Sequence, residues 1–184
     1  MCLLFEKSPA FKFQLGFFVP GGKMNKARLI ALGLSGVVAG TGITIARYEG
    51  KEIVGYVDPV GVVTSCYGHT RLAEVGKVYT DAECLELLAE DLEEHNQQLM
   101  QVVSVPLSRG EHIAYLSFHY NVGAGNFRRS SLLKLLNSGH RVRACNELQR
   151  WIYAGGRKLN GLIDRRDHER QLCLKGVNGV SNNL

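Results

Sequence analysis

Three kinds of motif are missing from this chain of 184 residues. No two of its five cysteines form a Cys-x-x-Cys pair, which argues against a zinc site and a thioredoxin-like redox motif. Gly21-Gly22-Lys23 lacks the spacing of a P-loop, and no other glycine motif for nucleotides is present. Internal repeats and low-complexity tracts are also absent. We therefore expect no metal, no cofactor and no nucleic-acid partner.

The composition that remains is that of an ordinary globular protein, with 45% hydrophobic and 21% charged residues. The length favours one domain, divided at most into two lobes. Charge is distributed unevenly, because residues 49–100 hold three Lys/Arg against eleven Asp/Glu, and residues 101–184 hold thirteen against five. This asymmetry indicates two lobes that attract each other, a basic surface for an anionic partner, or solvated helix faces of opposite sign.

The beginning of the chain does not read as part of a folded domain. Residues 1–23 show no helical or strand period, and they end in Gly-Gly-Lys directly before Met24. Codons for Gly-Gly-Lys form a purine-rich run of the kind that binds ribosomes upstream of a start. We expect Met24 to be the true initiator and residues 1–23 to be a misassigned or disordered extension.

A short basic head follows Met24, and residues 29–46 then run for eighteen positions without a charge. That length is the lower limit for crossing a bilayer. The run does not fit a cleaved signal peptide well, because no convincing Ala-x-Ala site precedes Arg47. It does not fit a core helix well either, because such a helix would rarely be so free of charge. A weak transmembrane anchor fits best, with Lys26 and Arg28 placing its N-terminal end in the cytoplasm. Its glycines make it marginally hydrophobic, so it can enter a membrane and leave it.

Helical signals dominate the rest of the chain, and strands are predicted only within residues 53–68. Two capping boxes, at Thr80-Asp81-Ala82-Glu83 and Ser108-Arg109-Gly110-Glu111, start predicted helices, of which the first ends near Met100. Residues 121–126 read as a turn-rich break. Further helices are expected from Ser130 or Ser131 to Leu136, over 142–153 and over 164–174.

A possible catalytic group lies before and within the strand region. Glu49, Asp58 and Thr64 bring two carboxyl groups and a hydroxyl into a short segment rich in valine and glycine. One carboxylic acid can protonate the leaving oxygen of a glycosidic bond while the other activates water. Spacing alone is also compatible with an exposed helix end at Glu49 and an ordinary turn at Asp58.

The pattern becomes specific when it is read as a whole. Glu49, Asp58 and Thr64 are followed by Tyr67-Gly68-His69-Thr70, by the block 118–127 (FHYNVGAGNF), by 151–156 (WIYAGG) and by 161–170 (GLIDRRDHER). In this order the blocks resemble the phage-type lysozymes of glycoside hydrolase family 24, over nearly all of residues 48–176. The resemblance implies an α+β, mainly α, lysozyme-like fold with a small β-sheet lobe and a helical lobe.

The resemblance also implies an activity, the hydrolysis of the β-1,4 bond between N-acetylmuramic acid and N-acetylglucosamine in peptidoglycan. Glu49 would be the general acid, Asp58 would hold or activate the water, and Thr64 would orient that water, with inversion as the outcome. Glu49 is expected to be buried between the lobes and Asp58 to be more hydrated. A catalytically inactive peptidoglycan-binding protein and a lytic transglycosylase remain as alternatives.

Other residues receive weaker assignments. His69 is expected to pack and hydrogen-bond at the end of the small sheet rather than to act as a base. Tyr120 and Asn121 are candidate glycan contacts, with helix capping and core packing as the alternative. Trp151 is expected to pack in the core. The pair Arg165-Arg166 would meet acidic wall peptides or lie on a solvated helix face.

A basic head, a glycine-rich anchor and a lysozyme domain together resemble the signal-anchor-release endolysins. The implied organisation is an anchor at 24–47, a lysozyme domain at 48–177 and a tail at 178–184. The protein would be exported by the Sec pathway, held in the inner membrane through residues 29–46, and released to the periplasm as a monomer when a holin or pinholin depolarises the membrane. Residues 29–50 would then refold onto the domain and carry Glu49 into place.

Four cysteines lie in the lysozyme region: Cys66, Cys84, Cys145 and Cys173. They would suit two disulfides in an oxidising compartment, or four buried thiols in the cytosol. Pairing within each lobe predicts Cys66–Cys84 and Cys145–Cys173.

Overall fold

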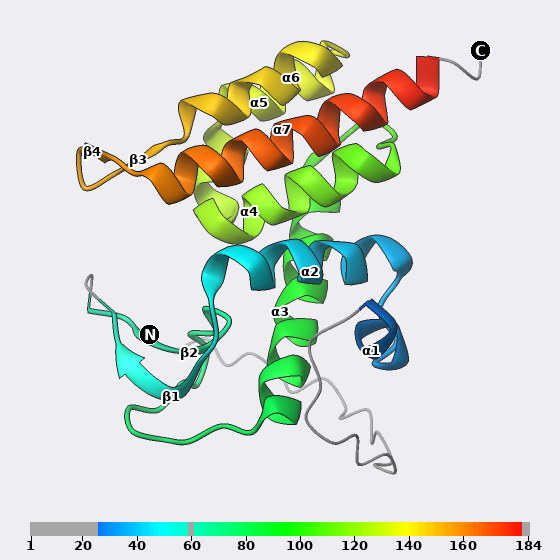
Figure 1. Ribbon diagram of the computed structural model, residues 1–184. Helices are drawn as coiled ribbons and strands as arrows, with labels where there is room; N and C mark the ends of the chain where they lie inside the picture. Colours follow the sequence, from blue (N-terminus) through cyan, green and yellow to red (C-terminus); the bar gives the residue numbers. More distant parts are fainter. Residues whose placement is uncertain (1–25, 59–60, 182–184) are drawn as a thin grey trace, which may run out of the picture.

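The computed structural model describes residues 26–58 and 61–181 (Figure 1). It is mainly helical, with two small antiparallel sheets, which confirms the predicted class. The hairpin formed by β1 (Glu52–Val57) and β2 (Val63–Cys66) lies near the start of α3 (Asp81–Val102), whereas α4 (Arg109–Arg129) packs on α7 (Asn160–Ser181) in the helical lobe. The long helix α3 therefore links the two lobes.

Both capping boxes start helices as predicted. Thr80 accepts a hydrogen bond from the amide of Glu83, whose carboxylate accepts from the amide of Thr80. Ser108 and Glu111 make the same reciprocal pair at the beginning of α4. The two N-termini are thus satisfied locally, and the apolar stripes behind them place α3 and α4 against each other.

The expected break at residues 121–126 is a kink rather than a loop. The helix α4 continues to Arg129, with one non-helical residue, Gly123, at φ 78° and ψ 158°. A glycine adopts this positive φ without steric strain. The following helix, α5 (Ser131–Asn137), is capped by Ser130.

The helix predicted over 142–153 is too long and is corrected by the structure. Helix α6 (Arg141–Glu147) ends early, and a 3₁₀ turn at Leu148–Arg150 follows it. A second hairpin, β3 (Tyr153–Ala154) with β4 (Arg157–Lys158), was not expected. Gly155 and Gly156 connect these strands with φ of 55° and 74°, the conformation that a tight two-residue hairpin turn requires. Helix α7 extends further than predicted at both ends.

The segment predicted to be an anchor forms two helices, α1 (Lys26–Ala31) and α2 (Gly36–Glu49), joined at Gly33 with φ 86°. In the described part of the chain no helix is both long and apolar enough to cross a bilayer. The anchor therefore stays a prediction, as do the start at Met24 and the nature of residues 1–23, which lie outside the described residues.

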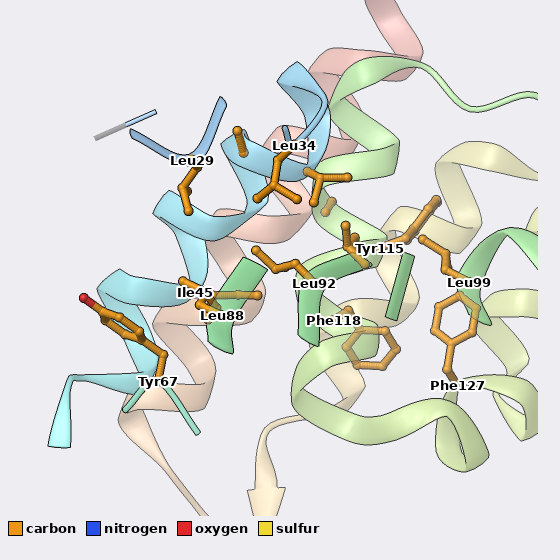
Figure 2. Packing of buried hydrophobic residues seen from close by; sticks show 14 of the residues in the cluster. Leu29, Leu34, Ile45, Tyr67, Leu88, Leu92, Leu99, Tyr115, Phe118 and Phe127 are labelled. Carbon is orange, nitrogen blue, oxygen red and sulfur yellow. The ribbon is translucent and has the colours of Figure 1, made fainter. Parts of the chain in front are cut away.

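Helices α1 and α2 contribute directly to the core. Leu29 and Ile45 are fully buried and lie beside Leu88 and Leu92 of α3 (Figure 2). Gly42 permits this close approach, because a Cβ atom there would lie 2.6 Å from Leu29 and 3.2 Å from Leu92. Helix α2 also packs on α4. In this structure the glycine-rich segment is thus a packed part of the domain.

Two disulfides join Cys66 to Cys84 and Cys145 to Cys173, which is the pairing expected. The first fastens the end of β2 to α3, and the second fastens α6 to α7. Each bond therefore stabilises one lobe.

Candidate active site at the junction of α2, α7 and the β-hairpin

Glu49 is the last residue of α2. Gly50 follows with φ 69°, a conformation that lets the chain leave the helix towards β1. The Glu49 side chain is 23% exposed, so it is half-buried rather than fully buried. Its Oε1 accepts a hydrogen bond of 2.5 Å from Nη1 of Arg165 on α7. The predicted acid is therefore held by a helix from the other end of the chain.

The second carboxylate oxygen of Glu49 faces the turn after β2. A Cβ atom built on Gly68 would lie 3.8 Å from Oε2 of Glu49 and 4.0 Å from the Tyr120 ring. Gly68 has φ 89°, which also favours glycine at this position. The Gly68-His69 pair of the sequence motif thus lies next to the proposed acid.

Asp58 and Thr64 are held on the two sides of the first hairpin. Asp58 follows β1, where its Oδ1 accepts from the amide of Val62 at 2.8 Å and its own amide donates to the Val62 carbonyl at 2.9 Å. Thr64 lies in β2, is buried, and donates its hydroxyl to the same carbonyl at 3.2 Å. Because this donor is occupied, the Thr64 oxygen is left to accept a hydrogen bond, as orienting a water requires.

Tyr48 fixes the end of α2 against α7. Its hydroxyl donates to the carbonyl of Asp164 at 3.4 Å, and the guanidinium of Arg165 lies 5.6 Å from its ring centre. The ring also lies 5.9 Å from that of His168. Burial raises the pKa of the Tyr48 hydroxyl. These contacts hold the residue that precedes Glu49 against α7.

The expectation that Arg165 and Arg166 lie on a solvated face or meet wall peptides is wrong. Their exposed fractions are 3% and 0%, and both contact Glu169, which is fully buried. Burial lowers the pKa of Arg166 to about 10 and raises the pKa of Glu169, although the two guanidinium groups oppose the latter change. The three residues form a buried charged cluster behind Glu49.

His69 has the structural role expected for it. It is buried, its backbone pairs with Ser65 at the end of β2, and its Nδ1 lies 2.8 Å from Oδ2 of Asp91 on α3. This contact ties the turn that carries Gly68 to the long helix. Trp151 packs against Phe118 with ring centres 5.2 Å apart and is partly buried at the edge of the core.

Tyr120 and Asn121, the candidate glycan contacts, both have partners within the protein. The Tyr120 hydroxyl donates to the Tyr67 carbonyl at 3.0 Å, and burial, with the charges of Asp91 and Glu49, raises its pKa. The Asn121 Oδ1 accepts from Arg166 at 3.1 Å. Contact of either residue with a sugar stays a prediction.

Sequence reasoning missed the cluster on α7, although a signal for it was present. Arg166, Glu169 and Cys173 follow one another at spacings of three and four residues, so they share one face of a helix. The disulfide at Cys173 marks that face as buried. Treating the arginines as surface charges overlooked this periodicity.

Comparison with known proteins gives a consistent result. The sequence profile of the family described as phage lysozyme matches residues 46–169. The SAR-endolysin of Bacteriophage PS119 is 41% identical over 92% of this chain and 97% of its own length. A crystal structure of a P22 lysozyme mutant is 30% identical, with a TM-score of 0.65 over 73% of this chain and 94% of that one. The active form of P1 phage endolysin Lyz is 25% identical, with a TM-score of 0.67 over 85% of this chain and 98% of that one.

The matched segment contains every part of the site described above, from the end of α2 to the buried Glu169 of α7. The profile, the curated relative and the solved structures agree over most of the chain, in both sequence and fold. The chain belongs to the phage lysozyme family.

Proposed function

We propose that this chain, an endolysin of the phage lysozyme family, cleaves peptidoglycan between N-acetylmuramic acid and N-acetylglucosamine with Glu49 as the general acid. The observation that carries the proposal is the asymmetric setting of Glu49. Oε1 is bonded to Arg165, while Oε2 lies beside Gly68 and makes no hydrogen bond within the described residues. One oxygen is thus fixed and the other is free to carry a proton to the leaving oxygen.

Asp58 and Thr64 supply the other half of the chemistry. The Asp58 carboxylate would accept a proton from water, and the Thr64 hydroxyl would orient that water by accepting its second hydrogen. Attack from the face opposite the acid inverts the anomeric centre, which needs carboxyl groups about 6.5–9.5 Å apart. The charge developing on the sugar ring would be stabilised by the Asp58 carboxylate.

Product analysis on purified peptidoglycan tests this reaction. Hydrolysis yields a free reducing end at muramic acid, initially as the α-anomer if the enzyme inverts. A lytic transglycosylase would yield anhydro-muramyl ends, and a wall-binding protein would yield no fragments. Mass spectrometry of the fragments with NMR of the first turnovers separates these outcomes, and anhydro ends would refute the hydrolytic mechanism.

We further propose that residues 29–46 tether the exported enzyme to the inner membrane until depolarisation by a holin releases it to the periplasm. The supporting relative is named a SAR-endolysin, and the likeness to the active form of P1 Lyz extends over 85% of this chain. In this structure Leu29 and Ile45 are core residues, and Glu49 at the end of α2 meets Arg165 of α7. An α2 held in lipid would keep the acid away from Asp58.

Membrane fractions test the tether. Membranes collected from energised expressing cells are expected to hold inactive enzyme, whereas cells whose membrane potential is dissipated before fractionation should yield active enzyme outside the membrane fraction. A Glu49→Gln preparation treated identically controls for other lytic activities. Full turnover while the protein stays in the membrane fraction would contradict the tether without affecting the proposed chemistry.

A further inference from the structure

Glu169 is a fully buried carboxylate with no part in the reaction as described above. Its Oε1 accepts hydrogen bonds from the Ser117 hydroxyl at 2.7 Å, from Nε of Arg165 at 3.2 Å and from Nη2 of Arg166 at 3.1 Å. Its Oε2 lies 2.9 Å from Nε of Arg166. A carboxylate removed from water is costly unless it is paired in this way. The pairs therefore fix the carboxylate and both guanidinium groups relative to each other.

The guanidinium of Arg165 is held from two sides. Nε donates to Glu169, and Nη2 donates to the Ser117 carbonyl at 3.3 Å. Because the group is planar and rigid, two fixed nitrogens determine where the third one points. That third nitrogen, Nη1, is the one that donates to Oε1 of Glu49. The position of the Glu49 carboxyl group thus depends on contacts made behind it.

We propose that Glu169 is a positioning residue for the general acid, acting through Arg165. It holds Arg165 so that Oε1 of Glu49 is occupied and Oε2 becomes the oxygen that carries the catalytic proton. This inference rests on the proposed function, because it assigns the proton to one oxygen of the same acid. It accounts for a buried acid between two arginines on a face where apolar residues would pack more simply.

Glu169 also sets the electrostatic balance at Glu49. Glu49 pairs with Arg165 and interacts electrostatically with Arg166 on α7 and Tyr120 on α4. The groups that act on its neighbours are Arg47, Asp164 and Glu169 at Tyr48, and Asp91 at Tyr120. With Glu169 neutral, the two arginines would face Glu49 with less compensation and would favour its ionised form. A general acid works only while it is protonated. The loss of activity on the alkaline side of the pH profile would therefore begin at a lower pH.

The test compares Glu169→Gln with the matched variant Glu111→Gln. Glu111 is also fully buried and paired with one arginine, Arg141, at 2.9 Å. The backbone of Glu111 lies beside Gly176 of α7. Gly176 is eleven positions, or about 16 Å along the helix, from Arg165. Both changes remove one buried charge and keep the shape of the side chain.

The readouts are kcat/KM on purified peptidoglycan across pH and the melting temperature of each variant. Glu169→Gln is expected to lower kcat by about tenfold or more and to move the alkaline limb of the profile down by about half to one pH unit. Glu111→Gln is expected to lower the melting temperature without moving that limb. In a double-mutant cycle Glu169→Gln should cost little further activity once Arg165→Met is present.

An unchanged alkaline limb in folded Glu169→Gln, or effects that add to those of Arg165→Met, would overturn the inference. If Glu169→Gln does not fold, the cycle is repeated with Ser117→Ala, which removes another hydrogen bond to the same Glu169 oxygen. A smaller shift of the limb in the same direction is then expected, and its absence overturns the inference. The proposed function fails separately, if Glu49→Gln keeps its activity.

Discussion

The two halves of the site are built by different kinds of interaction. Asp58 and Thr64 are tied to each other within the first hairpin, through hydrogen bonds to Val62 four or fewer residues away. Glu49 is held by Arg165, 116 positions further along the chain, and by the buried Glu169 behind it. The contacts of the proposed water-activating half are therefore close in sequence, whereas those of the proposed acid half join α2 to α7. Under the proposed release mechanism, displacement of α2 would separate Glu49 from Arg165.

The largest expected effect on stability comes from weakening the docking of α2. Ile45→Ala removes a fully buried side chain and is expected to cost about 2–5 kcal/mol of stability and most of the activity. Ile43→Ala, in the same helix but 38% exposed, should change stability by less than about 0.5 kcal/mol. Thermal unfolding and turnover of the released proteins measure both. Equal losses in the two variants would contradict a docked α2.

Removing one disulfide at a time distinguishes the contributions of the two lobes to stability and to activity. Each bond closes a loop, of 18 residues for Cys66–Cys84 and 28 for Cys145–Cys173, so each double serine variant should lose about 3 kcal/mol of unfolding free energy. Loss of Cys66–Cys84 should also reduce kcat, because it loosens the hairpin that carries Thr64. Denaturant unfolding with parallel kinetics checks this, and a selective loss of kcat from the other pair would reverse the assignment.

Gly68→Ala would place a methyl group 3.8 Å from Oε2 of Glu49, the oxygen proposed to carry the proton. Gly68 and Gly61 have nearly the same φ, 89° and 87°, but only Gly68 has atoms within 4 Å of the added carbon. Each alanine variant should lose about 1–2 kcal/mol of stability through backbone strain. Only Gly68→Ala is expected to lower kcat/KM several-fold. Matching kinetics in the two variants would show that the turn has no influence on the acid.

The smallest effect at neutral pH is expected from a pair of histidines on α3 and α4. His119 lies 2.8 Å from His95, Nδ1 to Nδ1, and burial together with His95 lowers its pKa to about 4. The unfolded chain binds this proton below about pH 6.5 and the folded protein does not, so stability should fall as pH falls from about 6.5 to 4. His119→Asn should flatten this part of the stability profile. An unchanged slope in that variant would assign the dependence to other groups.

The hairpin half of the site was predictable from the sequence, and the acid half only in part. Asp58 and Thr64 lie in a short segment whose strands follow from local alternation and turn residues. Glu49 could be named from the motif, but its partner Arg165 comes from a helix whose packing direction no local pattern determines. The arginine pair was misread because charge predicts exposure on average, and here two charges compensate a third inside the fold.

The environment of the N-terminal helices was also difficult to predict from local sequence. An uncharged run with many glycines favours a bilayer when read alone, since lipid and a protein core accept the same residues. The close approach at Gly42 to Leu29 and Leu92 reveals that those glycines also fit a packed interior. The sequence of this segment is therefore compatible with a lipid bilayer and with a protein core. Only the structure shows how it packs in the core.

The rate of wall hydrolysis by purified, released Glu49→Gln tests the central assignment most directly. The substitution keeps the shape of the side chain and leaves an oxygen to accept from Arg165, so the melting temperature should change little. Without a transferable proton the rate is expected to fall by at least about a thousandfold. A rate near that of the wild-type protein would contradict the role of Glu49.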